Sequence, residues 1–143
     1  MTYGPAAQAD PDNPKFDNVF VKPESYKAFM QTGHWPDKTM FVLEIREATS
    51  HGSINNAGHY QAKLAGIDVE LKDEKRFPQK WAFFAFGMHD KTAALPANSA
   101  CNACHSQSGA VDNTFVQFYP TLFEVAQKKG TLSPSFVQKS AEK

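Results

Sequence analysis

The sequence predicts an α+β domain built mainly on an antiparallel β-sheet, with a few flanking helices. Residues 39–47 and 65–73 alternate apolar with polar or small side chains, as half-buried strands do. Residues 22–33 and 120–130 instead carry apolar side chains at helical spacing and end at a glycine. Because a helix is followed by a run of strands and then by helices, the order is that of an α+β fold.

The length of the chain argues for one domain. Its 143 residues, 41% of them hydrophobic, can bury a single core, and they contain no internal repeat. Residues 1–15 hold three prolines, one glycine and no hydrophobic periodicity, so we expect an extended arm there. Residues 16–143 then form the domain.

Two helices are predicted at the ends of this domain. The first, over residues 22–33, has apolar side chains at positions i, i+3 and i+4, which are Tyr26, Phe29 and Met30. Gly33 is its expected C-terminal stop. The second runs over residues 120–129, with Pro120 in its first turn and Gly130 after its last.

The strands come between the helices. In residues 39–47 the inward side is expected to hold Phe41, Leu43 and Ile45. In residues 65–73 the apolar side holds Ala65, Ile67, Val69 and Leu71, and the other side holds Gly66, Asp68, Glu70 and Lys72. Residues 80–87 are so aromatic that both faces of that strand should be covered.

The charge balance narrows the class of partner. Fifteen basic residues offset fifteen acidic ones, so the chain has no net field to attract nucleic acid, an anionic membrane surface or a highly charged protein. No apolar run approaches the length of a membrane span. The partner is therefore expected to be small.

Both cysteines lie in one short motif, Cys-x-x-Cys-His at residues 101–105. This is the attachment pattern of a c-type haem, in which Cys101 and Cys104 add to the two vinyl groups from one helical turn and His105 meets the iron. The sequence therefore predicts one covalent haem c, held by a short helix in the C-terminal half.

Three other interpretations of the motif remain open. A thioredoxin-like redox pair would follow a strand of a βαβ unit, and the flanking residues show no such unit. A structural zinc site would need a fourth ligand, and the remaining histidines are scattered. A local disulfide would close too small a loop to add much stability.

The chain resembles the cytochrome P-460 family, which also contains the cytochromes c′-beta. The resemblance spans residues 19–129 and is carried by the segments 35–48, 58–77, 80–87 and 101–122. It implies a small β-rich monohaem protein, often dimeric, in which His105 is the axial iron ligand and the opposite side of the iron is open.

The resemblance leaves two functions open. In one branch of the family a lysine is linked to the porphyrin and the haem oxidises hydroxylamine, and Lys38 or Lys63 would be that lysine here. In the other branch an apolar cap lies over the iron, which binds nitric oxide or carbon monoxide. Phe41 is the candidate ring for such a cap.

We expect Phe41 and Lys38 to lie at the haem, and we expect ligand binding rather than oxidation. Glu44 and Asp68, the two possible bases, are placed by alternation on solvated faces.

A third function is electron transfer through a six-coordinate iron. Met88, His89 or His59 would then supply the sixth ligand. The redox partner of such a protein is unknown.

The location follows from the cofactor. Residues 1–15 have neither the cationic region nor the apolar stretch of a secretory signal, so Met1 either begins a cytoplasmic protein or stands where a signal was removed. Because haem c is normally attached outside the bacterial cytoplasm, we expect a periplasmic protein whose signal peptide has been removed.

Overall fold

The computed structural model describes residues 14–52, 54, 55 and 57–141. The arm expected over residues 1–15 lies outside this part of the chain except for its last two residues, and a strand already begins at Lys15. The strands are β1 (Lys15–Val21), β2 (Met40–Thr49), β3 (Tyr60–Lys72) and β4 (Trp81–Gly87). The helices are α1 (Pro23–Thr32), α2 (Ala100–Ser108), α3 (Pro120–Lys129) and α4 (Pro134–Ala141), with a 3-10 turn, η2, at Val116–Phe118.

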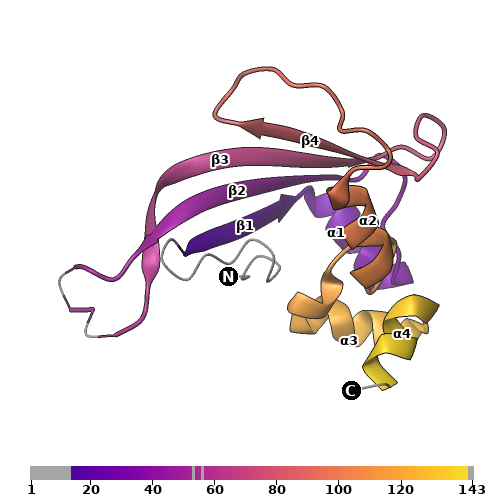
Figure 1. Cartoon of the computed structure of the whole chain (residues 1–143). Helices are drawn as coiled ribbons and strands as arrows, with labels where there is room; N and C mark the ends of the chain where they lie inside the picture. The colour runs from indigo at the N-terminus through magenta and orange to yellow at the C-terminus, as the bar shows by residue number, and fades with distance from the viewer. Residues whose placement is uncertain (1–13, 53, 56, 142–143) are drawn as a thin grey trace.

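The four strands form one antiparallel sheet in the order β1-β2-β3-β4. Figure 1 shows the helices gathered at one end of this sheet, where β1 finishes and β4 begins, while the β2–β3 hairpin extends beyond the other end. The α+β prediction is confirmed. Within the described part of the chain, each helix is too short or too polar to span a bilayer.

Helices α1 and α3 form where the apolar spacing predicts them. α1 ends at Gly33, whose φ of 76° is left-handed, and α3 ends at Gly130, whose φ is 67°. This conformation suits glycine because it has no Cβ, and it lets the chain leave each helix with a capping hydrogen bond. Strand β1 and helix α4 are additional elements that the sequence did not predict.

The two faces of the sheet differ in chemistry, and the cross-strand register identifies them. Phe41 on β2 lies opposite Glu70 on β3, which lies opposite Phe83 on β4. Residues directly opposite each other point to the same face of a sheet. The row of Phe41, Glu70 and Phe83 faces the helices, because the Phe83 ring contacts the His105 ring of α2. The next row, on the other face, is apolar across all four strands and consists of Phe20, Val42, Val69 and Phe84.

This register corrects the prediction for β3. The side holding Asp68, Glu70 and Lys72, expected to face solvent, is the side that faces the helices. Lys72 is buried with 5% exposure, and Asp68 and Glu70 are half-buried. The expectation that both faces of β4 are covered holds only at its start, since Trp81, Ala82 and Phe83 are buried and Ala85 is exposed.

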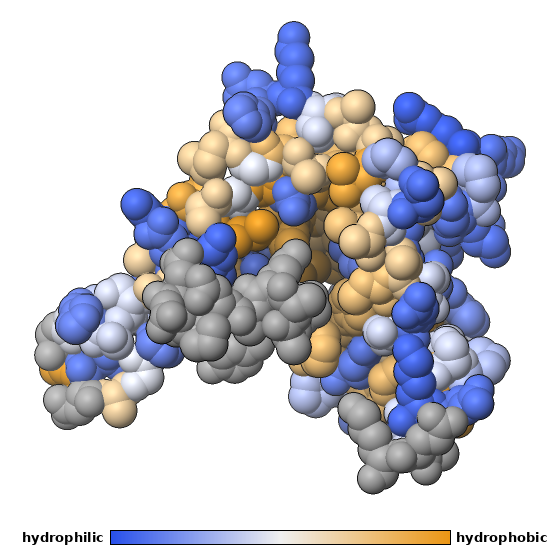
Figure 2. Space-filling model, in the orientation of Figure 1, coloured by the Kyte–Doolittle hydropathy of each residue, from blue (hydrophilic) through white to orange (hydrophobic). Residues whose placement is uncertain are grey.

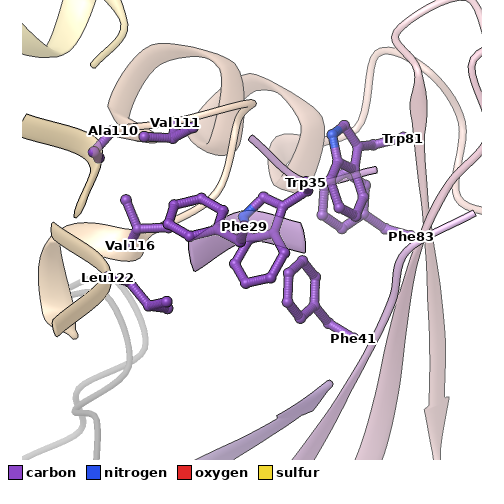
Figure 3. Packing of buried hydrophobic residues seen from close by; sticks show 10 residues of the cluster. Phe29, Trp35, Phe41, Trp81, Phe83, Ala110, Val111, Val116 and Leu122 are labelled. Carbon is purple, nitrogen blue, oxygen red and sulfur yellow. The ribbon is translucent and has the colours of Figure 1, made fainter. Parts of the chain in front are cut away.

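The core fills the space between the helical end of the sheet and the helices (Figure 3). Trp35 lies at its centre, with its ring 4.3 Å from that of Phe29 and 4.8 Å from that of Phe41. The other members are Trp81, Phe83, Ala110, Val111, Val116, Leu122 and Ala126. These contacts fix α1, the segments that flank α2, and the ends of β2 and β4 relative to one another.

Candidate functional site

Helix α2 carries the Cys-x-x-Cys-His motif, as predicted. The side chain of Ser99 caps its N-terminus by accepting a hydrogen bond from the backbone N–H of Asn102, and the Asn102 amide donates to the carbonyl of Pro96. One turn of this helix brings Cys101 and Cys104 to neighbouring positions. Both thiols are free and partly buried.

The imidazole of His105 is held between two aromatic rings. Its centroid lies 4.6 Å from that of Phe83 and 4.4 Å from that of Phe115, and its side chain is 15% exposed. Nδ1 lies 2.9 Å from the carbonyl oxygen of Asn113. A carbonyl can only accept, so Nδ1 carries the proton and donates it.

The tautomer of His105 leaves Nε2 free to coordinate a metal. Burial lowers the pKa of His105, against the opposing effect of the Asn113 hydrogen bond, so the ring is neutral at pH 7. A neutral imidazole with the proton on Nδ1 has its lone pair on Nε2. This is how histidine ligands of metals are normally arranged, with the second nitrogen hydrogen-bonded to a carbonyl or carboxylate.

Nε2 faces the carboxyl of Glu70 on β3. The distance from Nε2 to Glu70 Oε1 is 3.5 Å. Burial, and next the neighbouring Asp68, raise the pKa of Glu70 to about 8. Burial and then the same two carboxyls also raise the pKa of the Cys101 thiol. Asp68 and Glu70 therefore lie across from α2, and the prediction that alternation leaves Asp68 in solvent is wrong.

The other proposed base, Glu44, lies on the opposite face of the sheet. Its carboxylate accepts hydrogen bonds from Arg46 and Asn18, and these lower its pKa, that of Arg46 first. Here the prediction of a role away from the site is consistent with the structure.

The sheet face beside Glu70 is partly open and mixed in chemistry, with apolar side chains next to the carboxyls of Asp68 and Glu70. Leu43 and Ile45 of β2 point to this face and are only half-buried, and Val19, opposite Leu43, is 39% exposed. Figure 2 shows hydrophobic side chains at the surface between the sheet and the helices. A flat apolar ring attached to α2 would cover such a surface.

These residues fit a covalently attached haem. Two free thiols lie one turn apart, the adjacent imidazole presents Nε2, and aromatic and aliphatic side chains surround them. The zinc alternative finds no support in the described residues, because no group of three or more His, Cys, Asp or Glu side chains among them could hold a metal ion.

Phe41 points inward as predicted, since it is 7% exposed and stacks on Trp81 with centroids 5.6 Å apart. It lies in the same cross-strand row as Glu70 and Phe83, one strand away from the residue that faces His105. Its role as a ring over the iron stays a prediction.

The two candidate lysines are engaged elsewhere. Lys38 lies in a turn with φ of 65°, its side chain is 58% exposed, and its ammonium pairs with Asp73 and Asp37. Lys63 is 76% exposed and pairs with Glu47. The assignment of Lys38 to the cofactor stays a prediction, and the partners it has in the structure do not support it.

Sequence reasoning missed Glu70, Phe115 and Asn113 as site residues. The signal for Glu70 is a strand with apolar residues on one side and acidic residues on the other, a pattern that predicts a solvated acidic side. The signal for Asn113 was the pair Asp112–Asn113, because both residue types tolerate the left-handed backbone of a tight turn.

Comparison with known proteins bears on this site. The model of one protein family, described as Cytochrome P460, matches residues 3–116. The match includes the whole sheet and all of α2. No curated protein matches the chain.

Proposed function

Because the chain belongs to the cytochrome P460 family, we propose that it is a monohaem protein whose iron is held by His105 and binds a small molecule such as nitric oxide or carbon monoxide. Cys101 and Cys104 would carry the one haem c covalently. The observation that carries the proposal is the arrangement of His105, with Nδ1 bonded to the Asn113 carbonyl and Nε2 directed at the sheet.

The residues of the chain have separate tasks in this function. The haem supplies an iron that binds a diatomic ligand. Phe83 and Phe115 hold the His105 ring between them, so the protein offers one nitrogen in a fixed direction. The half-buried Leu43 and Ile45 would offer the haem apolar surface on the sheet side, beside the carboxyls of Asp68 and Glu70.

The placement of the other candidate ligands supports an open iron position. Met88 is 67% exposed and follows the last residue of β4, five residues beyond Phe83. At the rise of a strand this separation is about 16 Å. His89 and His59 are also exposed. The exposure of these three side chains therefore favours an iron without a sixth ligand from them.

Hydroxylamine oxidation is the second candidate, and Glu70 is the observation that favours it. Removing electrons from hydroxylamine also requires a base for its protons. Glu70, whose carboxyl lies 3.5 Å from Nε2 and whose pKa is raised to about 8, could supply one where it is ionised, above about pH 8. The surroundings of Lys38 and Lys63 favour the binding function instead, because the oxidising branch that the chain resembles has a lysine linked to the porphyrin.

Intact-mass spectrometry and ligand binding test the proposal on protein matured with haem-attachment machinery. We expect the mass of the chain plus one haem, and ready uptake of carbon monoxide by the ferrous protein. Met88→Ala and His59→Ala should leave the resting spectrum unchanged. A mass equal to the bare chain, or a low-spin spectrum that either substitution abolishes, would contradict it.

A steady-state assay with hydroxylamine and an artificial electron acceptor separates the two functions. We expect slow or no turnover, and tryptic haem peptides that contain residues 101–105 and no lysine fragment joined through the porphyrin. If turnover is fast, Glu70→Gln should abolish it while Glu44→Gln, on the opposite face, leaves it unchanged. That result would replace binding by oxidation as the function.

We further propose that the protein is periplasmic and forms a homodimer. The need for haem attachment outside the cytoplasm supports the location. The apolar row of Phe20, Val42, Val69 and Phe84 on the outer face of the sheet supports the dimer, because a second copy could bury the same row against it.

A further inference from the structure

A tight turn beyond α2 holds the carbonyl that orients His105. Val111 and Thr114 form an isolated antiparallel bridge, and the two residues between them have φ of 49° (Asp112) and 59° (Asn113). Positive φ at both central residues is the conformation of a type I′ turn, which is costly for residues other than glycine, asparagine and aspartate. Asp112 and Asn113 are residue types that tolerate it, and the side chains on either side of Asn113 hold the turn further.

The carboxylate of Asp112 is anchored from two other parts of the chain. Its Oδ2 accepts a hydrogen bond from the backbone N–H of Trp35, at 2.9 Å, and lies 3.7 Å from Nζ of Lys72. Its Oδ1 lies 3.1 Å from Nδ1 of His34. On the other side of Asn113, Thr114 Oγ1 accepts from the Trp35 indole N–H at 3.0 Å. Both neighbours of Asn113 are thus fixed to one loop.

Lys72 joins that loop to β3. Its side chain is 7% exposed, and its ammonium donates to the Trp35 carbonyl at 2.6 Å and lies 3.3 Å from Glu74 Oε1. A lysine is rarely buried to this extent, and burying it is costly unless acceptors and opposite charges surround it. In this position Lys72 binds both Trp35 and Asp112, the two groups that hold the turn.

We propose that Lys72 and Asp112 are positioning residues for the iron ligand, which act by holding the Asn113 carbonyl against Nδ1 of His105. This inference rests on the proposed function, in which Nε2 of His105 binds iron. A hydrogen bond from Nδ1 makes the imidazole a more basic ligand and fixes the plane of the ring. The pair would therefore set the strength of the iron–histidine bond through the turn and not as ligands.

Resonance Raman spectroscopy of the ferrous, ligand-free holoprotein measures this bond directly. In Lys72→Met and in Asp112→Asn we expect the iron–histidine stretching band to move to lower frequency and the midpoint potential to rise, because a looser turn weakens the Nδ1 hydrogen bond. Lys72→Arg keeps the charge and the donors, so it should restore the wild-type band. Lys128→Met, the same change at an exposed lysine of α3, should leave the band unmoved.

The outcomes distinguish this inference from the proposed function. An unchanged band in folded Lys72→Met and Asp112→Asn would overturn it while leaving the function intact. If Lys72→Met does not fold, Asp112→Asn decides alone, since the amide keeps the size of the side chain and an acceptor for the Trp35 N–H. A wild-type protein without an iron–histidine band would contradict the proposed function.

In that case the exchange of the Nδ1 proton of His105 with water, followed by ¹H–¹⁵N spectroscopy, would test whether Lys72 and Asp112 position the ring. We expect Lys72→Met and Asp112→Asn to speed this exchange.

Discussion

Glu70 illustrates how the surroundings of one residue decide its chemistry. By sequence it belongs to the polar side of an alternating strand, where a carboxylate is normally solvated. In the folded chain it lies between Phe41 and Phe83 across the sheet and faces His105. Burial rather than any bonded partner is the main reason for its raised pKa, so the protonated form is favoured.

The raised pKa of Glu70 predicts a pH dependence of stability. The pKa is 4.5 in the unfolded chain and about 8 in the folded one. Between pH 4.5 and pH 8 the Glu70 carboxyl is ionised in the unfolded chain but still protonated in the folded one. The free energy of unfolding therefore falls as pH rises from about 4.5 to about 8, and Glu70 adds no further change above pH 8. Glu70→Gln should remove on the order of a few kcal/mol of this decline. Urea unfolding at pH 5 and pH 9, on chain expressed without haem attachment, measures it.

The matched control for this prediction is Glu44→Gln. Hydrogen bonds from Arg46 and Asn18 lower the pKa of Glu44, so its loss should not flatten the profile between pH 5 and pH 9. Parallel pH profiles for wild type and Glu70→Gln would show that the carboxyl ionises normally.

At the scale of elements, the contact between α2 and the turn after it depends on Gly109. A Cβ at this position would lie 2.6 Å from the carbonyl carbon of Asn113 and 2.7 Å from both His105 O and Thr114 N. All three are backbone atoms, which cannot move aside as a flexible side chain can. Its φ of −69° is open to any residue, so the requirement for glycine is one of space.

Gly109→Ala should therefore force α2 and the turn apart. We expect a loss of about 1–3 kcal/mol in unfolding free energy, as for other overpacked sites, and a weaker hydrogen bond between His105 and Asn113. Denaturant unfolding measures the first and the iron–histidine band the second. Ser106→Ala, an exposed change on the same helix, should alter the unfolding free energy by less than about 0.5 kcal/mol. Equal stability of Gly109→Ala and wild type would mean that the backbone can relax.

Elements whose signal is local were predictable, and those that depend on distant partners were not. Helices α1 and α3 have apolar spacing and a terminal glycine within ten to twelve residues, and α2 follows from its motif. Strand β1 buries only Phe16 and exists through its pairing with β2, twenty or more residues away. The same holds at the candidate site, where the motif predicts Cys101 and His105 but not Glu70, because the neighbours of Glu70 come from other strands.

At the scale of the whole molecule, the outer face of the sheet has the composition of an interface. Phe20 is 55% exposed and Met40 is 36% exposed, and Val42 and Val69 beside them are half-buried. The chain has no net charge to keep two copies apart. These features agree with the homodimer proposed above.

Phe20→Glu should convert the dimer into a monomer. A charge placed in the apolar row would be buried against its own copy across a twofold axis, where it has no partner. Sedimentation velocity at several concentrations measures the change in mass. Phe118→Glu, at a position of similar exposure in η2, should leave the mass unaltered. A wild-type chain that sediments as a monomer at every concentration would contradict the dimer.

The turn at Asp112 and Asn113 has one more consequence, which concerns the order in which the protein folds. The groups that could hold a haem lie within five positions of each other. The contact between His34 and Asp112, in contrast, spans 78 residues, and that between Lys72 and Trp35 spans 37. Contacts of long sequence separation form only after the intervening chain has been ordered. The imidazole therefore acquires its full set of surroundings only once sheet, helix and turn have come together.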